Sequence, residues 1–520
     1  MLRKFVAVLL SAILLSAGWL GATGLTLFIG FIPLLWISES RGSSRREWWG
    51  MFGWALLTFV LWNAMTVWWI WYATPVGPLA ATLASSTLNM IAFMLFHTVA
   101  KRARRALAYV LLVAGWITTE YWYTVGEFSW PWLILGNGFS HDVWAVQWYE
   151  YTGVFGGSLW VLSVNLALFE VWRRRTRGAV AAAAALLVVP MVISLGLLAS
   201  WEEPKRTAAV TIVQPNVDPY SKFEDETADW QTENLLSLTA SASAGTQFIL
   251  LPETALPGYF NEAGIAESPL IRQLADTLRR CTPRAMLIAG CNTVRNYPAG
   301  HQSATARARY DGSYYDVFNA AAAIDSAGTV RLHRKGRLVI GVEKTPMPWL
   351  FKALEFLVID LGGTLGQLGV GMPGTVFSHD GVRVGTAICY EGLYGDFYGE
   401  FVRRGAEAVF IISNDGWWGD TPGYRHLFTI SRLRAIEHRR AIARSANTGR
   451  SGFIDARGRI GQTLGWEERG LLEGTVALDR RITFYTQWGD YIGRIAQYVM
   501  LLCILYYTAY RVKRRNHLVS

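Results

Sequence analysis

The chain has 520 residues and a formal net charge of +10, with 52% hydrophobic but only 17% charged residues. Soluble enzymes carry about 25% charged residues, so this composition argues against an ordinary soluble enzyme and indicates that a large part of the chain lies in lipid. The basic residues cluster beside apolar segments, so the net charge indicates membrane topology rather than nucleic-acid binding.

Eight apolar segments are candidates for membrane-spanning helices. A helix needs about 20 apolar residues to cross a hydrocarbon core of about 30 Å. Only the stretch from Gly21 to Gly24 separates the first two segments, and the number of later segments favours an uncleaved first helix over a signal peptide. The predicted spans are 5–20, 23–38, 50–72, 79–99, 106–124, 154–172, 179–199 and 488–510.

Basic clusters alternate with these spans. The loops 73–78 and 125–152 carry no Lys or Arg, whereas basic residues cluster at 3–4, 41–46, 101–105, 173–177 and 511–515. With eight spans the clusters fall on one side, which the positive-inside rule makes cytoplasmic. We therefore expect a multi-pass protein of the bacterial inner membrane, with its largest polar region on the periplasmic face.

One carboxylate lies within the predicted membrane region. An ionisable group near the centre of a spanning helix costs about 2.5–3.5 kcal/mol, so such groups are candidates for function. Glu120, however, lies near the outer end of its span, where a solvated or interfacial role is the expected one. The aromatic-rich stretch 121–151 is predicted to lie at the same interface and to floor the active site.

The polar region alternates short apolar runs with helix-like segments, which predicts a layered α/β domain. We expect a transmembrane domain over 1–200, this α/β domain over 205–482 and a final transmembrane helix over 488–511. The predicted strands are 207–213, 247–252, 285–290, 317–325, 382–389, 408–413 and 441–446. The predicted helices are 226–243, 265–280, 396–404 and 424–439.

Three chemically reactive residues stand at predicted strand ends. Glu253 follows Phe-Ile-Leu-Leu-Pro, Lys335 follows Thr-Val-Arg-Leu-His-Arg, and Cys389 follows Gly-Thr-Ala-Ile. Each alone is a weak signal, since a turn glutamate, a basic loop and a buried structural thiol are common. Together they supply the carboxylate, ammonium and thiol that thiol-based acyl chemistry needs.

In chain order these residues resemble the Glu-Lys-Cys set of the nitrilase (carbon–nitrogen hydrolase) superfamily. With the flanking spans, nearly the whole chain resembles the apolipoprotein N-acyltransferase family. The fold that this resemblance implies is a multi-pass α-helical membrane domain plus an extracytoplasmic α/β nitrilase-like domain, an α-β-β-α sandwich. The supporting motifs are Val-Gln-Pro-Asn at 213–216, Pro-Glu-Thr at 252–254, Lys-x-x-Leu-Val at 335–339, Cys-Tyr-Glu at 389–391, Ser-Asn-Asp-Gly-Trp-Trp-Gly at 413–419 and Ala-Asn-Thr-Gly at 446–449.

The resemblance implies a role for each reactive residue. Cys389 would be the nucleophile, Glu253 the general base, and Lys335 with the backbone N–H of Tyr390 the donors that stabilise an oxyanion. Burial is expected to raise the pKa of Glu253 toward the working pH.

Supporting residues follow from the same resemblance. Glu391, and Glu343 eight residues after the lysine, are expected to hold the lysine and the acceptor amine in place. The loop before Glu343 reads Leu-Val-Ile-Gly-Val, where the family often has Leu-Val-Pro-Phe-Gly. Asn414 and Trp417 are predicted substrate-binding residues.

Residues 346–373 form an apolar, glycine-containing stretch between the lysine and cysteine motifs. The apolar residues at 350, 354, 357 and 361 keep helical spacing, which predicts a lid that dips into the membrane. Trp349 and Phe351 would then contact acyl chains. An ordinary core helix followed by a loop is the alternative.

The implied reaction is phospholipid-dependent N-acylation of the N-terminal diacylglyceryl-cysteine of apolipoproteins, through a thioester on Cys389. Two alternatives remain: a membrane-tethered nitrilase-type amidase for a small amide, and a non-enzymatic ligand-binding membrane protein. No metal or cofactor is expected, because metal-binding motifs are lacking. Cys281 and Cys291 are close enough in sequence for a disulfide.

Overall fold

The computed structural model describes residues 1–75, 77–222, 224–298, 300–344 and 367–516. Two compact units make up this part of the chain. The first contains 1–71, 75–200 and the segment from Trp488 onward, and the second contains 72–74 and 201–487.

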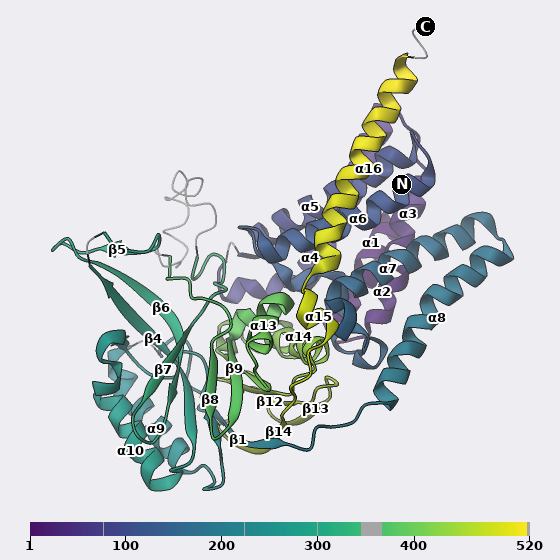
Figure 1. Ribbon diagram of the computed structural model, residues 1–520. Helices are drawn as coiled ribbons and strands as arrows, with labels where there is room; N and C mark the ends of the chain where they lie inside the picture. Colours follow the sequence, from purple (N-terminus) through teal and green to yellow (C-terminus); the bar gives the residue numbers. More distant parts are fainter. Residues whose placement is uncertain (76, 223, 299, 345–366, 517–520) are drawn as a thin grey trace. The chain divides into compact units, whose positions relative to one another are not determined.

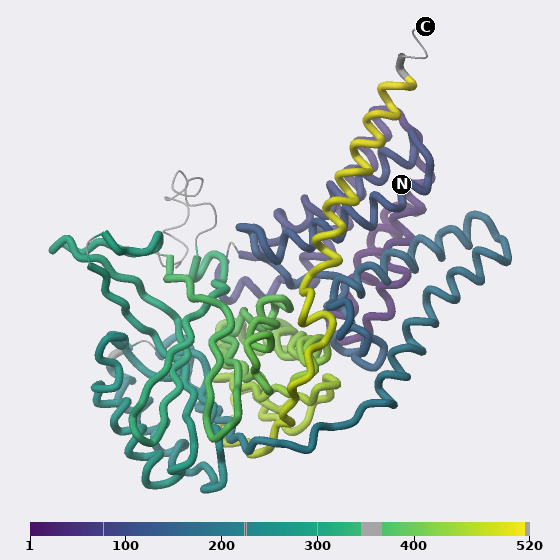
Figure 2. The backbone as a smooth tube through the Cα atoms, in the orientation of Figure 1, coloured from purple at the N-terminus to yellow at the C-terminus, as the bar shows by residue number. Residues whose placement is uncertain are grey.

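The first unit is helical (Figures 1 and 2). Its helices begin and end at residues suited to those positions. The Ser44 hydroxyl accepts a hydrogen bond from the Glu47 backbone N–H at the start of one helix, and Arg175 in the left-handed conformation ends another. The helices are α1 (Leu2–Ser16), α2 (Leu27–Gly30), α3 (Ile32–Glu39), α4 (Arg45–Val67), α5 (Gly77–Ala100), α6 (Arg105–Val125), α7 (Tyr149–Arg174), α8 (Arg177–Ala199) and α16 (Tyr491–Asn516).

Six stretches of helix in the described chain are long and apolar enough to cross a membrane, whereas the sequence predicted eight spans. The predicted span 23–38 becomes a shorter apolar helical segment, Gly24–Glu39. The predicted span 106–124 forms the helix α6 but is not among the six. A multi-pass helical membrane unit is nevertheless confirmed.

Glu120 is not solvated, contrary to one of its two predicted roles, because only 1% of this residue is exposed. Its Oε1 accepts hydrogen bonds from Trp116 Nε1 at 3.0 Å and from the Leu135 backbone N–H at 2.8 Å. A buried carboxylate needs such donors. Glu120 therefore ties the irregular segment that follows α6 to the helix itself.

The second unit contains two mixed β-sheets. The first has the order β14-β1-β2-β4-β6-β5, with β3 beside β4 and β7 beside β6, and the second has the order β13-β12-β11-β10-β9-β8. The first-sheet strands are β1 (Thr207–Gln214), β2 (Phe248–Leu250), β3 (Tyr259–Asn261), β4 (Met286–Tyr297), β5 (Arg307–Ala308), β6 (Tyr314–Ile324), β7 (Val330–Arg334) and β14 (Gly470–Ala477). Those of the second are β8 (Val376–His379), β9 (Val382–Ile388), β10 (Ala408–Ser413), β11 (Ile442–Ala446), β12 (Ser451–Ile454) and β13 (Ile460–Leu464).

The central strands are parallel and buried. In the first sheet β1, β2 and β4 run parallel, and in the second β9, β10 and β11 run parallel. Every residue of β10, Ala-Val-Phe-Ile-Ile-Ser, is buried, as expected for a strand that is covered on both faces. Because parallel strands end at a common edge, residues that follow β9 and β10 are brought close together.

Helices cover the outer faces of both sheets, and the sheets pack on each other. The helices α9 (Ala228–Ala240) and α10 (Pro269–Cys281) share a buried core with the first sheet. The helix α13 (Gly395–Arg403) packs on β9 and β10, and α14 (Pro422–His438) packs on α13. Phe248 of β2 and Phe410 of β10 meet between the sheets with ring centroids 5.3 Å apart. The predicted α-β-β-α sandwich is confirmed.

Candidate active site

Glu253 follows strand β2 and is positioned by its neighbour β4. The Leu251 N–H donates to Ile288 O at 2.8 Å, and the Gly290 N–H donates to Pro252 O at 3.0 Å. A Cβ atom added to Gly290 would lie 2.5 Å from Glu253 Cα, well inside van der Waals contact. Glycine at this position therefore permits the close backbone approach that fixes Glu253.

Lys335 directly follows strand β7. Its N–H donates to Asn319 O at 2.8 Å, which extends the ladder with β6 by one residue, and its carbonyl accepts from Gly371 N at 2.9 Å. The residue is 1% exposed. The backbone of Lys335 is therefore held on both sides, and only its side chain reaches into the site.

Cys389 follows strand β9 and begins a short 3-10 helix, Cys389–Leu393. Its φ of +50° lies in the left-handed region, which costs free energy for a residue with a Cβ. Glu391 holds this turn, because its carboxylate accepts from the Ile388 N–H at 2.7 Å and from the Gly336 N–H at 2.6 Å. A bond of 3.1 Å joins the same carboxylate to His333 Nε2. Glu391 thereby links the turn carrying Cys389 to the backbone beside Lys335.

The Lys335 ammonium lies between two carboxylates. Its Nζ is 2.9 Å from Glu253 Oε1 and 2.9 Å from Glu343 Oε1. The Asn319 amide donates to the same two oxygens, at 2.7 and 2.9 Å. The second oxygen of Glu253 accepts from the Asn414 backbone N–H at 3.0 Å. The charges are thus paired and hydrogen-bonded, as buried charges must be.

These contacts decide the protonation states. Burial alone would lower the pKa of Lys335, but the Glu253 and Glu343 carboxylates raise it well above its usual value. Burial alone would raise the pKa of Glu253, but the Lys335 charge and hydrogen bonds from Lys335, Asn319 and Cys389 lower it overall. The prediction of a raised pKa for Glu253 was therefore wrong. Burial, followed by the Glu253 charge, raises the pKa of the Cys389 thiol.

At neutral pH the site therefore holds an ionised carboxylate, a charged ammonium and a neutral thiol. This arrangement differs from a cysteine that is already a thiolate in the resting protein. A neutral thiol becomes a strong nucleophile only when it loses its proton, and the ionised Glu253 carboxylate is a hydrogen-bond partner that could accept that proton.

The other predicted residues occupy different places. Trp417 lies in a short 3-10 helix, Asp415–Trp418, and its ring meets that of Tyr220 at 5.6 Å. Cys291 is buried and Cys281 half-buried, and both are free thiols. Trp349 and Phe351 lie outside the described residues, so the lid stays a prediction.

Three polar residues of the site were missed by sequence reasoning: Asn319, His333 and Lys222. Asn319 is the one amide in the run Phe-Asn-Ala-Ala-Ala-Ala of β6, and a polar residue in such a strand was an available signal. His333 lies within the charged alternation Val-Arg-Leu-His-Arg and carried no such signal.

Lys222 is a second buried amine near Glu253. Its Nζ donates to Glu253 O at 3.1 Å and to Thr254 Oγ1 at 3.0 Å. Within the described residues no carboxylate forms an ion pair with it, and burial lowers its pKa to about 7 although the Glu253 charge opposes that shift. A neutral amine has two N–H donors, which the two acceptors satisfy.

Comparison with known proteins identifies the family of the chain. The carbon-nitrogen hydrolase family matches residues 208–484, and the apolipoprotein N-acyltransferase N-terminal domain matches residues 11–167. An apolipoprotein N-acyltransferase of Chlorobaculum tepidum is 31% identical over 490 residues, covering 90% of this chain and 89% of the relative. The chain belongs to the apolipoprotein N-acyltransferase family. It is accordingly a membrane protein and an acyltransferase of the carbon-nitrogen hydrolase superfamily.

A second relative and one solved structure are also similar to the chain. The apolipoprotein N-acyltransferase of Allorhizobium ampelinum is 29% identical and covers 89% of both chains. Among solved structures, a carbon-nitrogen hydrolase superfamily protein of Xanthomonas campestris, XC1258, covers 52% of this chain and 91% of its own, with 16% identity and a TM-score of 0.36.

Replacing Gly290 by Ala tests the close approach that positions Glu253. The added Cβ would collide with the backbone of residues 252–254 and displace the carboxylate, so we expect acyl transfer to fall about tenfold to a hundredfold while the protein stays folded. Acyl transfer to a lipopeptide, measured on detergent-purified protein, checks this. Gly245→Ala is the matched control, because a Cβ there meets open space. Equal activity of the two variants would contradict the positioning role.

The pH dependence of stability tests the environment of Lys222. The folded protein releases the Lys222 proton near pH 7, whereas the unfolded chain keeps it to about pH 10.4, so stability from this group rises with pH between those values. We expect wild type to gain thermal stability between pH 7 and 9 relative to Lys222→Met. If the unfolding temperatures of the two proteins instead changed by the same amount from pH 7 to 9, Lys222 would be shown to stay charged in the folded protein.

Proposed function

We propose that the protein transfers an acyl chain from a phospholipid to the α-amine of the N-terminal diacylglyceryl-cysteine of an apolipoprotein. The observation that carries this proposal is the neutral Cys389 thiol beside an ionised Glu253 that Lys335 holds in place. Its support also includes the family to which the chain belongs and the apolar helices of the first unit.

In the first half-reaction, the Cys389 sulfur attacks the ester carbonyl of the phospholipid while Glu253 takes the thiol proton. The carbonyl oxygen becomes an oxyanion, which Lys335 Nζ and the Tyr390 backbone N–H stabilise. One such donor contributes roughly 3–4 kcal/mol to the transition state. As the carbon–oxygen bond breaks, the leaving alkoxide takes the proton from Glu253. The products are a thioester on Cys389 and a lysophospholipid.

In the second half-reaction, the α-amine of the lipoprotein attacks the thioester carbonyl. Glu253 now accepts the proton that the amine loses, and the same donors stabilise the second oxyanion. The carbon–sulfur bond breaks, the amide is released, and Glu253 returns the proton to sulfur. Glu253 thus serves as base and acid in both halves. Its lowered pKa keeps the carboxylate ionised in the resting site, so that it can accept a proton, and its hydrogen bonds fix its position.

Exclusion of water decides whether the thioester reaches the amine. Cys389 and Glu253 are each 6% exposed, so bulk water has little access to the sulfur. A site open to water would hydrolyse the thioester and act as a phospholipase. The predicted lid around Trp349 and Phe351 would add to this protection.

The side of the membrane is also part of the proposal. The basic loops lie at one set of helix ends, including those of α5, α7 and α16. By the positive-inside rule we assign these ends to the cytoplasm and residues 201–487 to the periplasmic face of the inner membrane. A tethered amidase would use the same three residues, but full-length similarity to apolipoprotein N-acyltransferases favours lipid substrates.

Intact mass measurement tests the thioester. Wild-type protein mixed with phosphatidylethanolamine should gain the mass of one acyl chain, and a diacylglyceryl lipopeptide added afterwards should discharge it. Cys389→Ser should form no adduct that the lipopeptide discharges. A wild-type protein with neither adduct nor modified lipopeptide would favour the amidase alternative.

Asn319→Leu tests the amide that bridges Glu253 and Glu343. Losing a hydrogen bond to a buried charged group costs about 1.5–3 kcal/mol, so we expect acyl-enzyme formation to slow by about tenfold to a hundredfold. Rapid-mixing mass spectrometry measures that step alone. Asn296→Leu, at an exposed asparagine of β4, serves as control. An unchanged rate in Asn319→Leu would contradict a role of the Asn319 amide in acyl-enzyme formation.

A further inference from the structure

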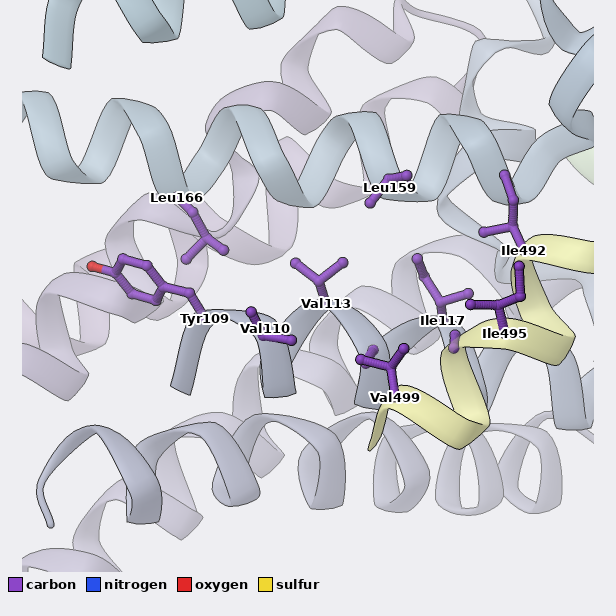
Figure 3. Close-up of a pocket in the computed structure, with 11 residues that line it drawn as sticks. Tyr109, Val110, Val113, Ile117, Leu159, Leu166, Ile492, Ile495 and Val499 are labelled. Carbon is purple, nitrogen blue, oxygen red and sulfur yellow. The ribbon is translucent and has the colours of Figure 1, made fainter. Parts of the chain in front are cut away.

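An apolar groove runs between helices α6, α7 and α16 of the first unit, with a volume of about 430 Å³. Figure 3 shows Tyr109 and Leu166 at one end and Ile492 at the other. Apart from Tyr109, every lining residue is aliphatic. The volume lies within the range of about 300–1,000 Å³ that is usual for small-molecule sites.

The groove has the length of an acyl chain in one leaflet. Its α6 wall extends from Tyr109 to Ile117, eight residues along the helix, which corresponds to about 12 Å. Half of a hydrocarbon core of about 30 Å is about 15 Å. A lipid acyl chain fits this length and apolarity.

One end of the groove leads directly to charged residues. The Tyr109 hydroxyl donates to Glu170 Oε1, one turn beyond Leu166 on α7. Glu170 in turn pairs with Arg173, at 2.9 Å, and with Arg174. Arg105 lies one turn before Tyr109 on α6 and pairs with Glu39 at 2.9 Å.

Positive charge exceeds negative charge at this end. The two carboxylates Glu39 and Glu170 pair with three guanidinium groups. Four further arginines flank this end, and none of them forms an ion pair with another described residue: Arg102, Arg104, Arg175 and Arg177. Figure 3 shows Ile492 of α16 at the Ile117 end of the groove, so the chain of α16 runs toward the basic end.

We propose that this groove binds one acyl chain of an anionic phospholipid, with the headgroup phosphate at Arg105, Arg173 and Arg174. Guanidinium groups form paired hydrogen bonds with phosphate oxygens, and basic pockets between membrane helices are suited to anionic headgroups. The lipid belongs to the leaflet on the side of the basic loops. Its binding does not depend on the proposed acyl-transfer reaction.

Native mass spectrometry of the delipidated full chain tests the proposal, with phosphatidylglycerol and phosphatidylcholine offered separately. Wild type should retain phosphatidylglycerol preferentially. The double variant Arg173→Gln/Arg174→Gln should lose about fivefold in that affinity per arginine, and Val113→Trp, which fills the groove, should retain one lipid molecule fewer than wild type with either lipid.

Two variants are matched controls. Arg45→Gln/Arg46→Gln removes the same charge from an exposed helix start, and Val188→Trp adds the same bulk to an exposed position on α8. Neither should change lipid retention. Equal retention of the two lipids by wild type would overturn the anionic site. An equal loss of phosphatidylglycerol in Arg45→Gln/Arg46→Gln would also overturn it, because the basic loops would then attract anionic lipids by their net charge, without a specific site.

Discussion

The ion pair between Lys335 and two carboxylates is the interaction on which the catalytic unit depends. Nζ lies 2.9 Å from both Glu253 and Glu343, in a site from which water is largely excluded. Removing one partner from a buried pair costs about 3–5 kcal/mol, because the remaining charge is left uncompensated. The same pair keeps Glu253 ionised despite its burial, and an ionised carboxylate is what a neutral thiol needs to become a nucleophile.

Much of the surrounding structure serves to bring three strand ends together at that pair. The first sheet supplies Glu253 and Lys335, and the second supplies Cys389. Close backbone approach at Gly290 fixes Glu253. The Glu391 carboxylate joins the turn that carries Cys389 to the backbone beside Lys335. The left-handed backbone at Cys389 is a local cost that these contacts offset.

The sequence predicted the fold well where strands are buried on both faces, since runs such as Ala408–Ser413 have a clear apolar signature. It missed β7, β13 and β14, because strands with exposed charged or polar residues lack that signature. It also missed β3, β5, β8 and β12, whose two to four residues are too few to show a period. Glu253 and Cys389 could be predicted from their places at the ends of predicted strands, and Lys335 from the run Thr-Val-Arg-Leu-His-Arg before it, although β7 was not among the predicted strands. The pKa of Glu253 could not, because the sequence indicates burial but not a lysine 2.9 Å away. Asn319 was indicated as a polar residue in an apolar strand, but its contacts with Glu253 and Glu343 could not be predicted, because they depend on strand register.

The most direct test of the account is the pH dependence of acyl-enzyme formation in wild type and in Glu253→Gln. If Glu253 takes the proton from a neutral thiol, the wild-type rate should not rise tenfold per pH unit between pH 7 and 9. A rate set by the thiolate fraction of a buried thiol with a raised pKa would rise in that way. Glu253→Gln should react more slowly and should follow thiolate formation as the pH rises. A wild-type rate that climbs tenfold per unit in parallel with Glu253→Gln would contradict the account, because the thiolate would then form without the carboxylate.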